Sequence, residues 1–308
     1  MATIYYSKAR ERAIQMIGDA RKGAWIVVTA PDEAELDQLA KDYDLDRDRL
    51  ADAVDIYEAP RLEIEGDTLY LFTRYCHPEG KEIATEPLLI IYTPDYLITV
   101  QRTPNPILSR LTTDVVDVVT TQKTKTLLQI FHEINRSYQI QLTRISKRLL
   151  QIRAQMRQSQ ISTREFVNII ELEEDLNEFL SALQPQSVLL HSIVNGRYLR
   201  LYEDDRDIVE DLERGEGELI ELTKSRLRTL TNMRQAYDAI ATNNLNNTFK
   251  RLTSIAIFLT IPTIVGGLFG MNVALPFQEH PQAFLFVLLI ITSFITLAIA
   301  IFRRKRWL

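Results

Sequence analysis

Two uncharged apolar stretches near the C-terminal end are the strongest pattern along the chain. Residues 252–278 contain no charged residue, and after Glu279 and His280 residues 282–302 are again free of charge. Each stretch supplies the ~20 residues that an α-helix needs to cross ~30 Å of hydrocarbon. Inside lipid the backbone polar groups must be satisfied within the segment. The pattern therefore predicts two transmembrane helices, 252–270 and 282–302, joined by an extracytoplasmic loop over 271–281.

The first 120 residues alternate between strand-like and helix-like segments. Residues 24–29 are rich in β-forming side chains, and a helix with two leucines on its apolar face follows over 31–39. Residues 62–75 are typical of a hairpin with its turn at Gly66-Asp67, and a second strand pair flanks Pro94-Asp95. These segments predict a mixed α/β domain over residues 1–120.

The pattern becomes helical over residues 121–201. Apolar residues recur every three or four positions from Leu127 to Met156, which predicts one long amphipathic helix. This helix is basic after Glu133, whereas the next segment, from Glu165 to Leu183, is acidic. We expect an antiparallel helical hairpin whose two members neutralise each other. Two independently solvated faces are the alternative, because surface ion pairs add little stability.

A third helix is predicted to begin near Tyr202, to form a stalk over 202–251 and to continue into the first span. Gly215 and Gly217 oppose helix formation, since each costs about 1 kcal/mol relative to alanine. A helix from 203 to 269 would be ~100 Å long, which implies packing against copies of itself. The predicted fold class is an α+β membrane protein with an N-terminal cytoplasmic α/β domain, a long helical stalk and two C-terminal transmembrane helices.

Charge orients the chain in the membrane. Lys250 and Arg251 precede the first span and a basic tail, 303–308, follows the second, while the loop between the spans has no Lys or Arg. The positive-inside rule predicts a multi-pass cell-membrane protein with both termini in the cytoplasm. Residues 250–308 hold six basic residues and one acidic residue, which leaves 30 basic and 40 acidic residues in 1–249, a net charge of −10. Such a domain repels nucleic acid and attracts cations.

Small and polar residues recur at spacings of three and four along one face of the first span. They are Thr253, Ala256, Thr260, Thr263 and Gly267, with Asn246 and Phe249 below them and Asn272 above. Close packing between helices would favour such a stripe. A water-filled pore at the axis of a helix bundle would favour it too, and the asparagines at both ends support the pore. The second span has no comparable stripe, so we expect it to face lipid.

These features together resemble the CorA family of divalent-metal transporters. The resemblance rests on Gly270-Met271-Asn272 at the outer end of the first span, the short loop, the second span and the basic tail 303–308. It is strongest over 243–308, and the order of the domains fits along the whole chain. It implies a homopentameric channel that admits Mg²⁺, with Co²⁺ or Ni²⁺ as further ions, under the membrane potential and is gated by intracellular Mg²⁺.

The resemblance also implies roles for individual residues. Gly270, Met271 and Asn272 would form the selectivity filter, and Leu252 a hydrophobic constriction above a polar ring at Asn246. Two positions depart from the family pattern. Phe269 replaces the usual tyrosine before the tripeptide, and Thr260 stands where some relatives carry a larger apolar gate residue.

Family members close when Mg²⁺ binds acidic sites between cytoplasmic domains, so the resemblance implies that Mg²⁺ is both transported and regulatory. The candidate ligands here are Asp204, Asp205, Asp207 and Asp211 on the stalk, facing Asp52 or Asp55 of a neighbouring α/β domain. For each one, a solvated surface acid is the alternative. In the outer loop, five copies of Glu279 would attract cations to the mouth.

Three alternatives compete with the Mg²⁺ channel. A Zn²⁺ transporter of the same family is the first, although no Cys or His lies on the predicted pore face. A membrane-anchored cytoplasmic scaffold is the second, and it leaves the polar stripe unexplained. An enzyme is the third, and it is disfavoured because the sequence has no Walker loop, GxGxxG motif or His/Cys cluster at metal spacing. No organic cofactor is expected.

Overall fold

The chain folds into two structural units. The computed structural model describes residues 2–9, 14–79, 82–113, 116–157, 163–195, 198–199, 201–273 and 281–305. Contacts divide the chain into Met1–Met233 and Arg234–Leu308. One helix, α6 (Glu203–Phe269), contributes to both units. The predicted hairpin region 121–201 and the first part of the stalk thus belong to the same unit as the α/β domain.

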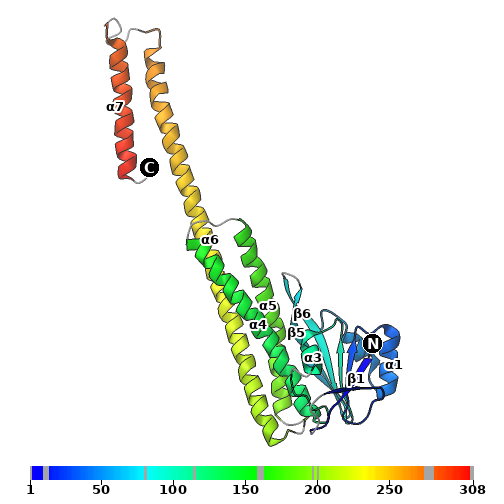
Figure 1. Cartoon of the computed structure of the whole chain (residues 1–308). Coiled ribbons are helices and arrows are strands. Elements are labelled where there is room, and N and C mark those ends of the chain that lie inside the picture. Colours follow the sequence, from blue (N-terminus) through cyan, green and yellow to red (C-terminus); the bar gives the residue numbers. More distant parts are fainter. Residues whose placement is uncertain are drawn as a thin grey trace. The chain divides into compact units, whose positions relative to one another are not determined.

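The N-terminal unit is built on a seven-stranded sheet in the order β2-β1-β3-β7-β6-β5-β4 (Figure 1). All neighbouring strands are antiparallel except β3 and β7, which are parallel. The strands are β1 (Ala2–Tyr6), β2 (Gln15–Ile17), β3 (Trp25–Thr29), β4 (Arg61–Glu65), β5 (Thr68–Glu79), β6 (Glu82–Tyr92) and β7 (Leu97–Gln101). The two predicted strand pairs, β4 with β5 and β6 with β7, are confirmed.

The central strands are apolar on both faces because both faces of the sheet are covered. In β5, Leu69 and Leu71 belong to one hydrophobic core, whereas Tyr70 and Phe72 belong to the other. Successive side chains of a strand point to opposite faces, so a strand buried on both sides consists of one continuous apolar run. The sheet therefore separates two cores rather than exposing one face to water.

Helices of different length cover the two faces (Figure 1). The short helices α1 (Glu33–Tyr43) and α2 (Arg47–Asp52) cover one face. The other face is covered by α3 (Pro106–Thr112), α4 (Lys123–Arg157), α5 (Thr163–Val194) and the beginning of α6. Asp32 starts α1 through a capping box, in which its Oδ1 accepts the Glu35 N–H at 2.7 Å.

The predicted helical hairpin is confirmed as α4 and α5, and its members meet through apolar side chains. The rings of Tyr138 and Phe179 lie edge to face with centroids 5.2 Å apart. Glu178 of α5 binds the sheet, because its Oε1 accepts hydrogen bonds from the Thr85 N–H and Oγ1 at 2.7 Å. At this position the acidic helix therefore anchors to β6, and mutual neutralisation of the two helices stays a prediction.

A small polar cluster is buried where β5, α5 and α6 meet. Thr73 donates a hydrogen bond to Gln186, and Glu216 of α6 is only 1% exposed. Within the described part of the chain, the carboxyl oxygens of Glu216 make no hydrogen bond. Burial raises the pKa of Glu216 to about 8, with a contribution from the charge of Glu213, while the nearby Gln186 amide opposes the shift. Glu216 is thus folded into the core as a neutral acid at neutral pH.

The C-terminal unit contains the last part of α6 and the helix α7 (Ala283–Arg304). Both helices are long and apolar enough to cross a membrane, and their most apolar stretches are only 6% and 0% buried. α6 ends at Phe269 and α7 begins at Ala283, each one residue from the predicted end of the first span and start of the second. Arg303 and Arg304 belong to the last turn of α7 rather than to a separate tail. The predicted fold class is confirmed, with an α/β domain, a long helix and two apolar C-terminal helices.

The buried Glu216 predicts how stability changes with pH. Its pKa in the folded chain exceeds the ordinary value of 4.5, so the folded state holds the proton more tightly and loses stability as pH rises between about 4.5 and about 8. We expect the midpoint of thermal unfolding to fall over this range. The substitution Glu216→Gln, which keeps the shape and removes the ionisation, should reduce that fall.

The matched control for this measurement is Glu210→Gln, at an exposed position on the same helix. It should leave the pH dependence unchanged. An equal fall in the native chain and in Glu216→Gln would contradict the assignment.

Candidate ion-conducting face

The part of α6 that forms the first predicted span has two faces with opposite surroundings. Its α7 side includes the fully buried Ser254, Val265 at 9% exposure, and Phe258, whose ring centroid lies 5.6 Å from that of Phe302. At 3.6 residues per turn, the predicted polar stripe lies on the opposite side of the helix. Its members are all exposed: Thr253, Ala256, Thr260, Thr263 and Gly267. Within one chain, α7 therefore leaves the polar stripe uncovered.

The threonine hydroxyls of the stripe present acceptors outward. Thr260 Oγ1 donates to the Ala256 carbonyl at 2.8 Å, and Thr263 Oγ1 donates to the Leu259 carbonyl at 2.9 Å. Because the hydroxyl proton is donated to a carbonyl of the same helix, the lone pairs of each hydroxyl oxygen remain as acceptors. Water molecules around a cation point their hydrogens away from it, so these oxygens can accept hydrogen bonds from the shell of a hydrated cation.

The tripeptide Gly270-Met271-Asn272 follows directly after the last helical residue, Phe269. The Gly270 N–H still donates to the Gly266 carbonyl at 2.9 Å, and the Met271 N–H donates to the Leu268 carbonyl at 3.3 Å. A Cβ at position 270 would lie 3.2 Å from the Gly266 oxygen, so glycine allows this tight ending. All three residues are exposed. Their role as a filter stays a prediction, and Glu279 lies outside the described residues.

The same face continues below the span. Phe249 is 56% exposed, Leu252 is 62% exposed, and Asn246 is exposed as well. Arg251 is exposed and Lys250 is half-buried. The residues of the predicted polar ring and hydrophobic constriction thus lie on surfaces that no described residue of the single chain covers.

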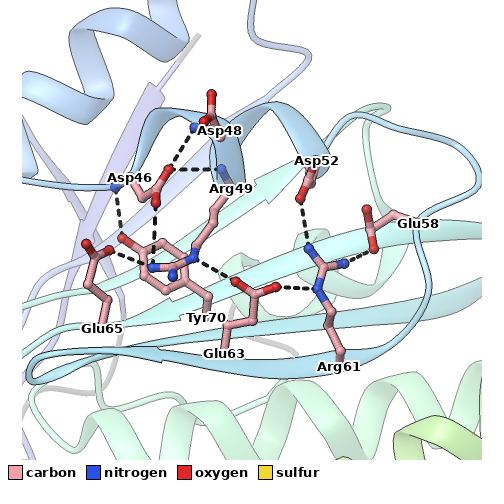
Figure 2. A network of polar contacts seen from close by, with 9 residues as sticks. All are labelled: Asp46, Asp48, Arg49, Asp52, Glu58, Arg61, Glu63, Glu65 and Tyr70. Carbon is pink, nitrogen blue, oxygen red and sulfur yellow. Dashed lines mark hydrogen bonds and ion pairs between the residues drawn. The ribbon is translucent and has the colours of Figure 1, made fainter.

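Figure 2 shows the surroundings of Asp52, a predicted regulatory ligand at the end of α2. Its Oδ2 lies 2.8 Å from Nη2 of Arg61. Arg61 also pairs with Glu58 and places its Nε 2.6 Å from Oε1 of Glu63. The hydrogen bond from Arg61 is the main cause that lowers the pKa of Glu63. Asp52 is therefore held in place by a guanidinium that is shared among three carboxylates.

A second guanidinium extends this network along β4. Arg49 Nε lies 2.7 Å from Glu63 Oε2, and its Nη1 lies 2.6 Å from Glu65 Oε2. The Arg49 guanidinium also lies over the Tyr70 ring, 4.7 Å from its centroid. Across the residues drawn in Figure 2, six carboxylates accompany two guanidinium groups, which leaves an excess of negative charge on this edge of the sheet.

The stalk acids differ in exposure. Asp205 is only 6% exposed, and its Oδ2 accepts the Tyr202 N–H at 3.1 Å at the start of α6. Asp207 is exposed. Asp211 is exposed as well, and its Oδ1 lies 3.3 Å from Nη1 of Arg214. The side chain of Asp204 is outside what the structure describes. Asp55 accepts the Tyr57 N–H at 2.9 Å. Among the described residues of one chain, no three His, Cys, Asp or Glu side chains could hold a common metal ion. A regulatory site between subunits stays a prediction.

Sequence reasoning missed the residues that fix the loop after α2. Two arginines hold this loop: Arg61 pairs with Glu58, and Arg74 donates to the Ile56 and Glu58 carbonyls. Neither belongs to a spacing that suggests a site. The available signal was the alternation of charged residues at Arg61, Glu63 and Glu65 along the first strand of the predicted hairpin, which the structure places at the edge of the sheet. Charges at such positions protect an edge strand from pairing with another strand, so this signal alone indicates protection as readily as function.

Comparison with known proteins places these features in a family. The family model described as CorA-like Mg²⁺ transporter protein matches residues 21–304. The chain is 26% identical over 297 residues to the cobalt/magnesium transport protein CorA of Methanocaldococcus jannaschii, which covers 92% of this chain and 91% of that protein.

Two solved structures share the fold. The complete structure of the CorA magnesium transporter from Methanocaldococcus jannaschii has a TM-score of 0.86 at 23% identity and covers 100% of this chain and 99% of that one. The cytoplasmic domain of ZntB from Vibrio parahaemolyticus has a TM-score of 0.64 at 12% identity, over 79% of this chain and 98% of that domain. At these identities the likeness concerns the fold and not the transported ion.

The two faces of α6 predict different reactivity toward a charged, water-soluble thiol reagent. A cysteine at Thr263 should react and block transport, whereas a cysteine at Val265, on the α7 side, should not. The native Cys76 is 2% exposed, and burial raises the pKa of its thiol, so it should give little background. Equal labelling at 263 and 265, measured by mass shift, would contradict a water-lined stripe.

Proposed function

The chain belongs to the CorA family of Mg²⁺ transporters, and we propose that it is a homopentameric channel through which the membrane potential drives Mg²⁺ into the cytoplasm. The family transports Mg²⁺ and Co²⁺ and does not consist of enzymes. The observation that carries the proposal is the exposed polar face of α6, which leads to Gly270-Met271-Asn272 and lies opposite the side that packs on α7.

A ring of subunits supplies the cover that this face needs. In a ring, each α6 turns its polar stripe toward a common axis, and each α7 lies outside, where its apolar side chains meet lipid. Phe284 and Leu289 of α7, 74% and 68% exposed, suit such a position. Water at the axis satisfies the threonine and asparagine side chains, which would be costly against hydrocarbon.

The tripeptide suits an ion that keeps its water. Mg²⁺ loses its hydration shell reluctantly. Amide oxygens of Asn272 and carbonyl oxygens of Gly270 would accept hydrogen bonds from that shell, and as neutral groups they would not trap the ion as carboxylates would. The thioether of Met271 is too soft a ligand for Mg²⁺, so we assign it a packing role in the filter.

The proposed driving force is the membrane potential alone. A divalent ion that enters an inside-negative compartment gains about 4.6 kcal/mol per 100 mV. Basic residues at both ends of the paired spans, Lys250 and Arg251 before the first and Arg303 and Arg304 at the end of the second, support the proposed orientation with both termini in the cytoplasm.

Closure is proposed to follow Mg²⁺ binding between subunits. Asp207 and Asp211 are exposed on α6, whereas the carboxylate of Asp205 accepts the Tyr202 N–H at the start of the helix. Asp52 or Asp55 of a neighbouring subunit would complete the site. Repulsion among these carboxylates would open the assembly when Mg²⁺ is scarce, and bound Mg²⁺ would draw them together. The constriction that closes is proposed at Leu252, with Thr260 too small and polar to form a second one.

Uptake into proteoliposomes tests the proposed channel. With an inside-negative potential, the native chain should take up Mg²⁺, and Asn272→Ala should reduce this uptake at least about tenfold, which corresponds to about 1.4 kcal/mol on the barrier. Asn247→Ala, next to the stripe residue Asn246 but on another side of the helix, is the matched control. No potential-driven Mg²⁺ uptake by a folded oligomer, or Zn²⁺ uptake that exceeds it, would contradict the proposal.

The regulatory cluster is tested by neutralising its acids. The triple variant Asp52→Asn, Asp207→Asn and Asp211→Asn should keep conducting at internal Mg²⁺ concentrations that close the native channel. Asparagine at 52 can still accept a hydrogen bond from Arg61, so the loop should keep its structure. The control is Asp48→Asn, an exposed acid of α2 outside the predicted set. Inhibition of the triple variant at the native Mg²⁺ concentration would reject the assignment.

A further inference from the structure

A pocket of about 220 Å³ lies between α3 and α4 and reaches Cys76 of β5. Its residues on α4 recur at spacings of three and four, so one face of this helix forms a wall of the pocket. The charged and amide side chains of the pocket are Arg110 on α3 and Glu133, Arg136, Gln141 and Arg144 on α4. We call this the arginine pocket. Three guanidinium groups therefore meet in a small space.

Two of the arginines share one buried carboxylate. Glu133 is 5% exposed, and its Oε2 accepts a hydrogen bond from Nε of Arg110 at 2.9 Å. Its Oε1 lies 3.5 Å from Nη1 of Arg136 and 3.9 Å from Nδ1 of His132. One negative charge thus faces two guanidinium groups. A guanidinium has five N–H donors, so Arg110 and Arg136 keep donors for a ligand.

The third arginine pairs with no acid among the described residues. Nη1 of Arg144 donates to Oε1 of Gln141 at 3.2 Å, and Gln141 is only 4% exposed. An amide carries no charge, so it holds the guanidinium without neutralising it. Three arginines and one glutamate give the pocket a net charge of +2. Residues 1–249 hold 30 basic and 40 acidic residues, so the arginine pocket is opposite in sign to the region around it and attracts anions.

Two further acids lie near the Cys76 end of the pocket. Burial is the main cause that raises the pKa of the Cys76 thiol, and the charges of Glu178 and Asp175 on α5 raise it further, whereas Arg144 lowers it. Neither acid lines the pocket. Oε1 of Glu178 already accepts hydrogen bonds from the N–H and hydroxyl of Thr85. A bound anion is therefore expected toward α3 and the three arginines.

We propose that the arginine pocket binds a small anion that carries two or more phosphate groups. Guanidinium groups bind phosphate oxygens through paired hydrogen bonds, which lysine cannot match. Arg136 and Arg144 are eight positions apart, ~12 Å along the helix axis, so a chain of phosphates bridges them better than a single one.

The size of the pocket limits what enters it. Pockets for drug-sized ligands measure ~300–1,000 Å³, and this one measures about 220 Å³. A phosphate chain fits inside, and any group attached to it would lie outside. Inorganic diphosphate and the phosphate end of a nucleotide share this chemistry. The site lies within one chain, so the proposal is independent of the ring assembly.

Titration calorimetry of the purified full chain with inorganic pyrophosphate tests this site. The buffer is free of Mg²⁺, which would itself bind the phosphates, and low in salt. We expect saturable binding that added KCl weakens. Arg144→Gln should weaken it at least about tenfold, because a charged hydrogen-bond donor to the anion is lost. Glu133 keeps both of its arginines in this variant, so the fold should persist, and the midpoint of thermal unfolding checks this. Arg144→Lys keeps the charge without the paired donors and should bind with intermediate affinity.

The matched control is Arg153→Gln, because Arg153 is an exposed arginine of α4 that does not line the pocket. It should bind pyrophosphate as the native chain does. A second titration with ATP distinguishes the two sources of the anion. Equal affinity for ATP and pyrophosphate would support the phosphate chain of a nucleotide, and binding of pyrophosphate alone would support an inorganic anion. If the folded native chain bound neither, or if Arg144→Gln bound with native affinity, the proposal would be overturned.

Discussion

A helix that crosses hydrocarbon can carry a polar face only if something other than lipid covers that face. This constraint governs the membrane part of the protein. α7 packs on the side of α6 that contains Ser254, Phe258 and Val265, and it leaves the threonine stripe uncovered. Hydroxyl groups, two asparagines and a glycine-ended helix on one uncovered side require partners. In the proposed assembly, copies of the same helix around water satisfy all of them together.

The continuity of α6 connects this face to the N-terminal unit. The helix has 67 residues from Glu203 to Phe269, so the stalk acids and the residues before the filter share one backbone without a hinge loop. Gly215 and Gly217 lie inside it without interrupting it. In the proposed mechanism, ion binding near Asp211 changes how neighbouring stalks approach each other, and the same helix carries that change to Leu252. A short connection between separate helices would not transmit it in this way.

Much of the fold could be predicted from the sequence because strong periodic patterns determine it. Three patterns each allow one structure: the sustained spacing of three and four residues between apolar positions in α4, the turn at Gly66-Asp67, and the two uncharged spans. The short elements β1, β2, α2 and α3 were not predicted, since segments of three to seven residues contain too few periods to show a pattern. The core acid Glu216 was not predicted either, because burial of a single carboxylate depends on the packing of β5, α5 and α6.

The candidate site also has parts that the sequence predicts and parts that it does not. The polar stripe is a local feature of one helix, so spacing was enough to find it. The tripeptide Gly270-Met271-Asn272 was noticed from its place after the first span, and its proposed role as a filter comes from the family resemblance. The loop after α2 depends on tertiary contacts, such as those of Arg74 with the Ile56 and Glu58 carbonyls. Sequence spacing gives no signal for such contacts, because Arg74 lies on a strand that is distant from the loop in the chain.

The central claim is that the polar stripe of α6 surrounds a common axis. Distances between spin labels in lipid bilayers test this claim most directly. A label at Thr263 of every subunit should give two short distances in a ratio of about 1.6, which is the geometry of a five-membered ring. A label at Phe294 on α7 should give longer distances in the same ratio. If the distances at Thr263 equalled or exceeded those at Phe294, the stripe would face away from the axis and the account would be wrong.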